Sequence, residues 1–391
     1  MESTKVLADI VHEYGQSRRP ARSPHNMLIP LLLTGQRAFV GVSLTYCTMR
    51  QQLTAVYQKC NMNRNCPDYY VEPSSEASLS ATKDLIAHIR SFPRPTRGNS
   101  TLDALVQPIL TPRFAISCTP DLMSSLGELA SSDSTLRIQT HISENPREVA
   151  YTKELFPNSK TYTNVYDDHG LLRENTILAH AIHLEDEEVE LIKRRKAGIS
   201  HCPTSNFNLS SGVARVGEYL DRGIKVNISP WPTSFLAHYP HSPQVGLGTD
   251  VSGGFSPSIL TVIQHTSIAS KVISFTSKPT PSKPDSFANK HLPIATLLFL
   301  ATLGGAQVCC LEHQVGSFAV GKSFDALIVN VTKGAGNPAL WSSLGEGEGG
   351  ATVSKEALEG MLERFLFCGD DRNISSVYVQ GRHIGGKNFG V

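Results

Sequence analysis

Short apolar runs alternate with amphipathic stretches through the middle of the chain, which indicates strands alternating with helices. Strands are predicted at Val106–Leu110, Leu136–His141, Thr176–His180, Gly198–His201, Gly223–Val226 and the run that ends with Gly246–Asp250. Helices are predicted at Asp121–Ala130, Pro146–Leu155, Glu185–Arg195, Val213–Asp221 and around Ser258–Ile273. This order is typical of βαβ units, so the sequence predicts an α/β fold with a parallel sheet.

The last third of the chain has a different pattern. Two further strands are predicted at Asp325–Val331 and Val377–Val379, with the glycine-rich segment Gly345–Gly350 between them. We therefore predict two parts. Residues 1–320 form the main α/β domain, and residues 321–391 form a small C-terminal β segment.

Two segments interrupt the pattern. Residues 16–35 are rich in Arg, Pro and Ser. Residues 227–245 contain four prolines and a tryptophan between two runs that together would make one buried strand. Proline at this density is unfavourable inside a strand. Our hypothesis is that both segments are insertions into an older framework; ordinary long loops are the alternative.

Composition narrows the class of protein. The 391 residues carry 36 Lys+Arg and 35 Asp+Glu, so the formal charge is +1. This balance gives no electrostatic reason to expect nucleic acid or an anionic membrane as partner. The eight cysteines contain no C-x-x-C pair, which favours a reduced, cytoplasmic setting. The run Met27–Leu33 is too short to span a bilayer and has no cleavage site after it.

Three predicted strands end in side chains that can bind a metal. His141 and His180 end two strands, Asp250 ends a third, and Glu144 follows His141 by three residues. Taken singly, each His can be a hydrogen-bonded core residue and Asp250 can be a helix N-cap. In a parallel α/β barrel, however, the carboxyl ends of the strands meet at one mouth. Nitrogen and oxygen donors gathered there suit Zn²⁺ or Fe²⁺.

Two further histidines follow these strand ends. His201 lies in the polar turn Ser200–Asn206, where it either lines a pocket or is satisfied in the core. His183 follows His180 by three residues and is predicted to be a solvated loop residue.

Several stretches, in order along the chain, resemble the amidohydrolase superfamily and, within it, the guanine deaminases. The matching stretches are Pro112–Phe114 with Ser117–Cys118, His141–Asn145, Leu178–Ala181, Ser200–Ser205, Gly246–Gly254, Ala301–Ala306, Val320–Lys322 with Phe324–Ala326, and Gly369–Ile374. The resemblance covers about residues 2–15 and 36–379, less the second insertion. It implies a metal-dependent hydrolase with a TIM-type (β/α) barrel.

The resemblance also implies roles. His141 and Asp250 would bind one Zn²⁺, and His180 would position the water that the metal activates. Glu144 would carry a proton from that water to the purine ring and to the leaving amine. Arg113 and Phe114 would hold the purine, so that His141, Glu144, Asp250, Arg113 and Phe114 form the expected substrate-binding set. The implied reaction is the hydrolysis of guanine to xanthine and ammonia in a cytoplasmic protein, and the resemblance also suggests a homodimer.

One feature of the family pattern is missing. Its barrel begins with a strand that ends His-x-His and supplies two more metal ligands, whereas no two of the 14 histidines here are two positions apart. We therefore expect an incomplete barrel without its first strands. Two alternatives stay open: an inactive fragment or pseudoenzyme, and a deaminase of another heterocycle such as a triazine or pterin.

Overall fold

The protein is described by a computed structural model. It describes residues 38–40, 42–44, 57–68, 71–91, 96–97, 100–101, 104–223, 244–251, 253–276, 286–340 and 354–389. The predicted insertion at residues 16–35, the predicted strand residues 224–226 and most of the predicted insertion at residues 227–245 lie outside the described residues.

A six-stranded parallel sheet organises the molecule. Its order is β1-β6-β7-β8-β9-β10, and all five pairings are parallel. The strands are β1 (Ala38–Val40), β6 (Val106–Leu110), β7 (Arg137–Ile142), β8 (Thr176–His180), β9 (Gly198–His201) and β10 (Val245–Leu247). In the described part of the chain, β1 and β10 are the two edges, so the sheet is an open, incomplete barrel.

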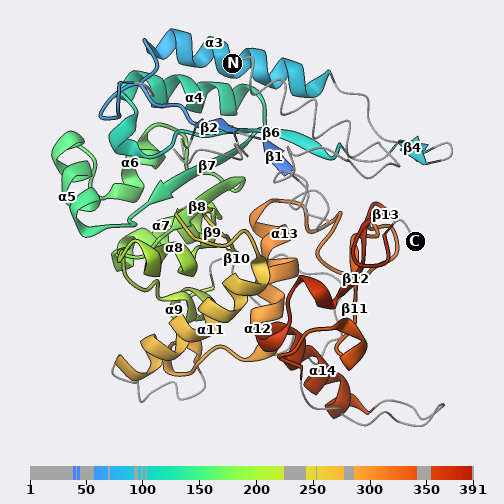
Figure 1. Ribbon diagram of the computed structural model, residues 1–391. Coiled ribbons are helices and arrows are strands. Elements are labelled where there is room, and N and C mark those ends of the chain that lie inside the picture. The colour runs from blue at the N-terminus through green and yellow to red at the C-terminus, as the bar shows by residue number, and fades with distance from the viewer. Residues whose placement is uncertain are drawn as a thin grey trace.

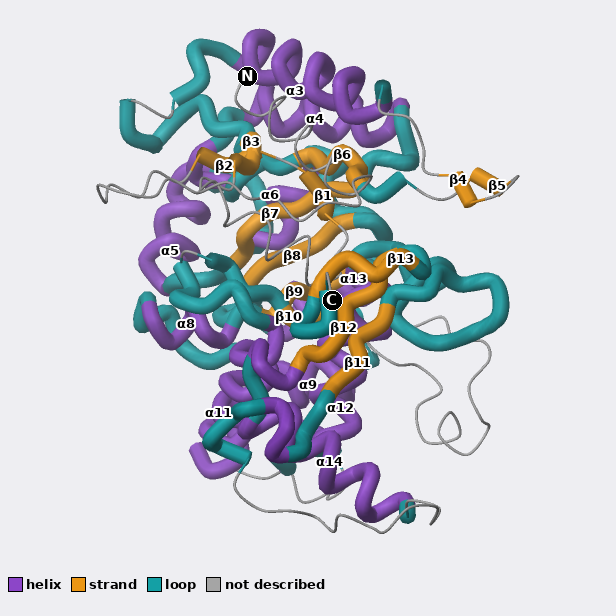
Figure 2. Tube along the Cα trace, turned by 45° about the vertical axis from the view of Figure 1, so that its right-hand side comes forward, coloured by secondary structure: helices purple, strands orange, loops and turns teal. Residues whose placement is uncertain are grey.

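The helices between these strands, together with α11 after the last of them, confirm the predicted alternation. They are α3 (Ser75–Arg90), α4 (Pro120–Ser132), α5 (Pro146–Leu155), α6 (Tyr162–Asp168), α7 (Asp186–Arg195), α8 (Pro203–Asn208), α9 (Val216–Asp221) and α11 (Ile259–Thr276). Figures 1 and 2 show α3 and α4 side by side at the β6 end of the sheet, while α11 lies towards the β10 end. The core between sheet and helices is formed by fully buried side chains such as Leu122, Ile138, Tyr166, Leu178 and Ile192.

Strand β7 illustrates how the pleat sorts its side chains. Ile138, Thr140 and Ile142 are buried against the helices, whereas the alternate residues Gln139 and His141 are only partly buried. Successive side chains of a strand point to opposite faces. His141 therefore stands on the inner face of the sheet, away from the helical layer.

Helices at the β10 end pack closely on the sheet. They are α12 (Ile294–Phe299), the π-helical turn Leu300–Gly304 and α13 (Gly305–Val308). A Cβ atom on Gly246 would lie 2.9 Å from the Cα atom of Gly305, and one on Gly198 would lie 3.0 Å from Val308. Glycine at these two strand positions is what allows the close approach.

The C-terminal part forms a separate antiparallel sheet, as predicted. It consists of β11 (Ala326–Val329), β12 (Ile374–Val379) and β13 (Arg382–Gly385), with α14 (Lys355–Cys368) beside it (Figure 1). Two small antiparallel ribbons complete the strands. One pairs the two-residue strands β4 (Thr96–Arg97) and β5 (Ser100–Thr101), and the other pairs β2 (Val42–Leu44) with β3 (Tyr57–Lys59). A mainly apolar cleft of about 910 Å³ separates the parallel sheet from the C-terminal elements and is lined by Ile109, Ile177, Leu327 and Phe365, among others.

One strand end differs from the prediction. The run that includes Gly246–Asp250 was expected to be a strand up to Asp250, but β10 ends at Leu247 and Asp250 lies in the following loop. The reason is local: Gly248 follows the strand, and Asp250 has a left-handed backbone with φ 45°. Among the helices that the structure describes, none has the length and apolar character needed to cross a bilayer.

Candidate metal and substrate site

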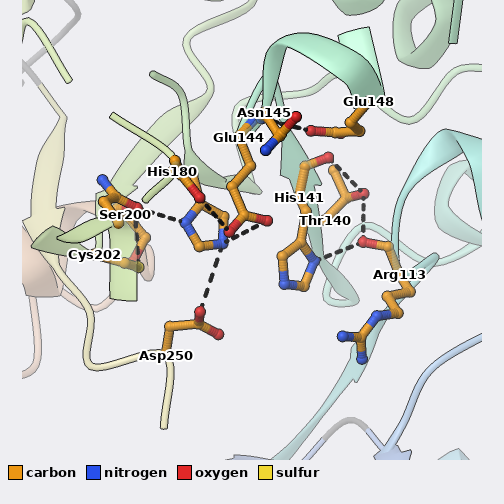
Figure 3. Close-up of polar contacts among 12 residues, drawn as sticks. Arg113, Thr140, His141, Glu144, Asn145, Glu148, His180, Ser200, Cys202 and Asp250 are labelled. Atoms are coloured by element: carbon orange, nitrogen blue, oxygen red, sulfur yellow. Dashed lines mark hydrogen bonds and ion pairs between the residues drawn. The ribbon is translucent and has the colours of Figure 1, made fainter. Parts of the chain in front are cut away.

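Three metal-binding side chains converge at the carboxyl ends of the parallel strands. His141 comes from β7, His180 from the end of β8, and Asp250 from the loop after β10; one donor atom from each lies within 4.8 Å of the others. Figure 3 shows the His180 ring between Asp250 and Glu144, with His141 beside it. The structure thus brings together residues that are far apart along the chain.

The backbone around this point is strained. Ser143, His180, Ala181 and Asp250 all have positive φ angles, of 48°, 70°, 51° and 45°. A left-handed conformation costs a non-glycine residue about 1–3 kcal/mol and is typical of functional sites. Backbone hydrogen bonds where β7 and β8 end hold these conformations in place. The Ala181 N–H donates to the Ile142 carbonyl at 3.0 Å, and the Ile182 N–H donates to the Ser143 carbonyl at 3.1 Å.

His180 is completely buried, and its two ring nitrogens have different surroundings. Nδ1 lies 2.9 Å from Oδ1 of Asn206. Nε2 lies 3.8 Å from Oε2 of Glu144 and 3.8 Å from Oδ2 of Asp250, and it has no hydrogen-bond partner among the described residues. A buried nitrogen without a partner, facing two carboxylates, marks a place for a cation or a water molecule.

His141 is oriented by the backbone of the neighbouring strand end. Its Nδ1 lies 2.7 Å from the carbonyl oxygen of Arg113. A carbonyl only accepts, so Nδ1 carries the hydrogen and Nε2 keeps its lone pair. Burial, followed by electrostatic interactions with nearby His180 and Arg113, lowers the pKa of His141 to about 4. The ring is therefore neutral near pH 7, which is the form that binds a metal.

Glu144 is held by the loop that connects β7 to α5. Its Oε1 accepts a hydrogen bond from the Ser211 hydroxyl at 3.2 Å. Its backbone N–H, at 2.9 Å, and that of Asn145, at 3.1 Å, both donate to Oε2 of Glu148, and Tyr162 donates to Oε1 of Glu148 at 2.5 Å. These bonds fix the loop, so that the Glu144 carboxylate points at His180 (Figure 3).

Arg113 and Phe114 lie shortly after β6, next to His141. The Phe114 ring meets the His141 ring edge-on with centroids 5.9 Å apart, and the Arg113 guanidinium carbon lies 5.6 Å from the Phe114 ring centroid. Tyr166 ties this segment to β7, because its hydroxyl accepts from the Ala115 N–H at 2.9 Å and donates to the His141 carbonyl at 2.7 Å. A cation and an aromatic face are thus available beside the three donors.

The two other histidines lie apart from the donor group. His201 is buried and lines a small internal cavity with Ala214, Thr266 and Leu292. Neither of its ring nitrogens has a partner in the described part of the chain, and burial lowers its pKa to about 3. The prediction for His183 was wrong: it is partly buried, and its Nε2–H donates to the Ser211 carbonyl at 2.8 Å.

Sequence reasoning missed the residues that hold the donors in place. Asn206, Glu148, Tyr166 and Ser211 contact His180, the Glu144 loop or the His141 backbone. Two of them had a detectable signal. Asn206 lies in the polar turn singled out for His201, and Asn145-x-x-Glu148 is a capping-box pattern.

The donor set suits a borderline divalent metal. Two imidazoles and one carboxylate are the ligand types of Zn²⁺, and the unpartnered Nε2 of His180 is the sort of atom that such an ion or its water satisfies. The described residues thus supply three donors at one point.

Comparison with known proteins agrees with this geometry. The model of the Amidohydrolase family matches residues 27–384. A probable guanine deaminase of Schizosaccharomyces pombe is 44% identical over 352 residues, which is 90% of this chain and 55% of that protein. The guanine deaminase of Dictyostelium discoideum is 39% identical over 352 residues, again 90% of this chain and 63% of that protein.

A solved structure is similar as well. The crystal structure of guanine deaminase from C. acetobutylicum with bound guanine in the active site superposes with a TM-score of 0.66 and 34% identity, covering 92% of this chain and 68% of that one. The chain therefore spans only 55% and 63% of the length of the two curated relatives.

Proposed function

Because the chain belongs to the amidohydrolase family, we propose that it carries the active site of a zinc-dependent guanine deaminase, which hydrolyses guanine to xanthine and ammonia. One observation supports this most: His141, His180 and Asp250 converge within 4.8 Å, with Glu144, Arg113 and Phe114 around them. The named relatives and the guanine-bound structure of a similar protein point to the same substrate.

His141 and Asp250 would hold the zinc ion. Bound zinc lowers the pKa of water towards about 7 and so makes hydroxide available at neutral pH. His141 is prepared for this role because its Nδ1–H is bonded to the Arg113 carbonyl and its Nε2 is free of protons.

His180 and Glu144 would handle the water and its proton. The unpartnered Nε2 of His180 faces the space between the two carboxylates and can hold the attacking water in line with the substrate. The Glu144 carboxylate can carry one proton from that water to a ring nitrogen. It can then carry the second proton, from the added hydroxyl, to the amine, so that ammonia leaves as the new carbonyl forms. A positioned acid–base group of this kind contributes about 10²–10⁴-fold to the rate.

Arg113 and Phe114 would recognise the purine. The rigid guanidinium fork of Arg113 can donate to the carbonyl oxygen of guanine in a fixed direction. The Phe114 ring offers a flat apolar surface for the heterocycle.

A non-catalytic protein is the second candidate. The observation that favours it is the number of donors: the described residues supply three, and none of the 14 histidines forms a His-x-His pair. A catalytic zinc site normally has three protein ligands besides water, and here one of the three would have to be His180.

The decisive experiment measures zinc and product in the purified full chain. For the deaminase we expect about one zinc per chain and xanthine formation from guanine. Glu144→Gln should keep the zinc and lose about 10²–10⁴-fold of the rate. Arg113→Lys, which keeps the charge but loses the planar fork, should mainly raise KM for guanine. Absence of both zinc and xanthine in the unaltered chain would favour the non-catalytic protein.

Location and assembly are part of the proposal. We place the enzyme in the cytoplasm because of its cysteine usage. A homodimer is proposed from the family resemblance; light scattering of the purified chain tests it.

A further inference from the structure

We propose that Asn206 is a positioning residue that holds the His180 ring in the tautomer protonated on Nδ1, so that Nε2 faces the site as an acceptor. This inference rests on the proposed function for its catalytic meaning. It rests on the contacts around His180 for its structural content.

The Asn206 side chain is well placed for this role. Its Oδ1 lies 2.9 Å from Nδ1 of His180, and both residues are almost fully buried. Its backbone is fixed on both sides, because its N–H donates to the Cys202 carbonyl at 3.0 Å and its carbonyl accepts from the Ser211 N–H at 2.8 Å. Asn206 is thus held in short helix α8, directly behind the His180 ring.

The surroundings of Nε2 favour a hydrogen on the other nitrogen. The nearest carboxylate oxygens, on Glu144 and Asp250, are both 3.8 Å away, which is beyond hydrogen-bonding distance. A hydrogen on Nε2 would be buried without an acceptor, whereas a hydrogen on Nδ1 has one at 2.9 Å. Burying an unpaired donor is unfavourable.

The neighbouring histidine has the same arrangement. Nδ1–H of His141 donates to the Arg113 carbonyl, and its Nε2 is directed to the site. Two stacked imidazoles, with ring centroids 5.2 Å apart, would then present lone pairs to one point beside Asp250. Histidines that bind a metal commonly donate their second ring N–H to a carbonyl or carboxylate in this way.

The position of the ring hydrogen decides what Nε2 of His180 can bind. An unprotonated Nε2 accepts a hydrogen from water or coordinates a cation. If the Asn206 amide were turned to donate from Nδ2, the ring hydrogen would move to Nε2, and His180 would repel a cation at this point. Asn206 therefore decides which of two functions the ring can have.

Nitrogen-15 NMR of the full chain with labelled histidine, without metal or substrate, tests the tautomer. The spectra are recorded at about pH 8.5, two units above the ordinary histidine pKa. The His180 signals are identified by their loss in His180→Gln. We expect the hydrogen on Nδ1, and a hydrogen on Nε2 would overturn the proposal. Because no zinc or guanine is present, this result is independent of whether the chain is a deaminase.

Three variants test the role of Asn206 itself. Asn206→Leu removes the acceptor and should give a mixture of tautomers, whereas Asn206→Asp keeps an acceptor and should keep the hydrogen on Nδ1. Asn175→Leu is the matched control, because Asn175 donates to the Leu136 carbonyl at 2.7 Å at the opposite end of β8. It should leave the His180 tautomer unchanged.

An unchanged tautomer in a folded Asn206→Leu variant would refute the positioning role. If that variant does not fold, the tautomer in the unaltered chain and in Asn206→Asp still decides.

Discussion

Individual residues at the strand ends combine chemistry with unusual backbone conformations. His180 and Asp250 take positive φ angles that non-glycine residues rarely adopt, and both face the same point. Short-range contacts maintain these conformations, among them the bond from Asn206 to His180 and the capping of the Glu144 loop by Glu148. The residues with strained backbone conformations therefore lie where the donor atoms converge.

Gly253 is a residue at which small size matters for the donor group. A Cβ atom there would lie 2.5 Å from Oδ2 of Asp250 and 2.7 Å from the Ser205 hydroxyl. We expect Gly253→Ala to displace the Asp250 carboxylate and to weaken zinc binding at least 10–100-fold. Gly334→Ala is the control, since the nearest atom to its Cβ is 3.4 Å away. Calorimetric titration with zinc measures both, and equal affinities would contradict the prediction.

Because His201 is buried, we expect the free energy of unfolding to depend on pH. Burial lowers its pKa to about 3, whereas in the unfolded chain the value is about 6.5. The unfolded state therefore binds more protons below about pH 6.5, so the free energy of unfolding falls as the pH drops through that range. The slope contributed by His201 is at most about 1.4 kcal/mol per pH unit.

The measurement is urea unfolding between about pH 7 and 5. His201→Leu should flatten the pH dependence of the free energy of unfolding. His291→Leu, at an exposed position, should leave it as in the unaltered chain. A His201→Leu variant with the original slope would refute the assignment.

At the scale of single elements, helix α5 connects local sequence signals to the site. Asn145 caps it, Pro146 opens it, and Glu148 completes the capping box while binding the Glu144 backbone. The sequence signals that start the helix are thus the same ones that hold the loop with the carboxylate. Helix α8 has a similar relation to His180 through Asn206.

Removing the α5 cap should affect both stability and the loop. Asn145→Ala should lower the free energy of unfolding by about 0.5–2 kcal/mol and increase hydrogen exchange of the Glu144 amide. Ser354→Ala, at the N-cap of α14, should cost a similar free energy without changing that amide. Unfolding curves and residue-level hydrogen exchange check the pair, and equal exchange in both variants would count against the link to Glu144.

At the largest scale, polar contacts join the parallel sheet to the segment that follows the later helices. Arg137 on β7 is the clearest one: its guanidinium donates to the Cys309 carbonyl at 2.5 Å, the Cys310 carbonyl at 3.0 Å and Gln107 at 2.7 Å. It fastens the end of α13 to the sheet beside the apolar cleft of about 910 Å³. This junction is distant in sequence and close in space.

Loss of this junction should destabilise the molecule. Arg137→Met keeps the apolar stem but removes three hydrogen bonds, each worth about 1.5–3 kcal/mol at most for a charged group. We expect a loss of about 2–4 kcal/mol, since such losses are not additive. Arg147→Met, on the exposed side of α5, should change stability by less than about 0.5 kcal/mol. Similar midpoints of urea unfolding for the two variants would disprove the proposed role of Arg137.

The alternation of strands and helices could be predicted from the amino-acid pattern alone. Strands β6, β8 and β9 and helix α5 have the predicted bounds, because their signals are local: apolar runs, turn residues and caps. The pattern also predicted His141, His180 and Asp250 as strand-end donors; the three do converge, but Asp250 lies in the loop after β10. Helices α3 and α14 were not predicted, although each has a local signal in its N-cap serine, Ser74 and Ser354.

The orientation of the donors, in contrast, depends on contacts between segments that are distant along the chain. Asp250 adopts a left-handed conformation after β10. The hydrogen bond between Asn206 and His180 joins residues 26 positions apart, and the one between Ser211 and Glu144 joins residues 67 positions apart. Local propensity carries no information about such distances. The parallel sheet brings these residues to one edge, and the packing of α5 and α8 against it sets the directions of the side chains.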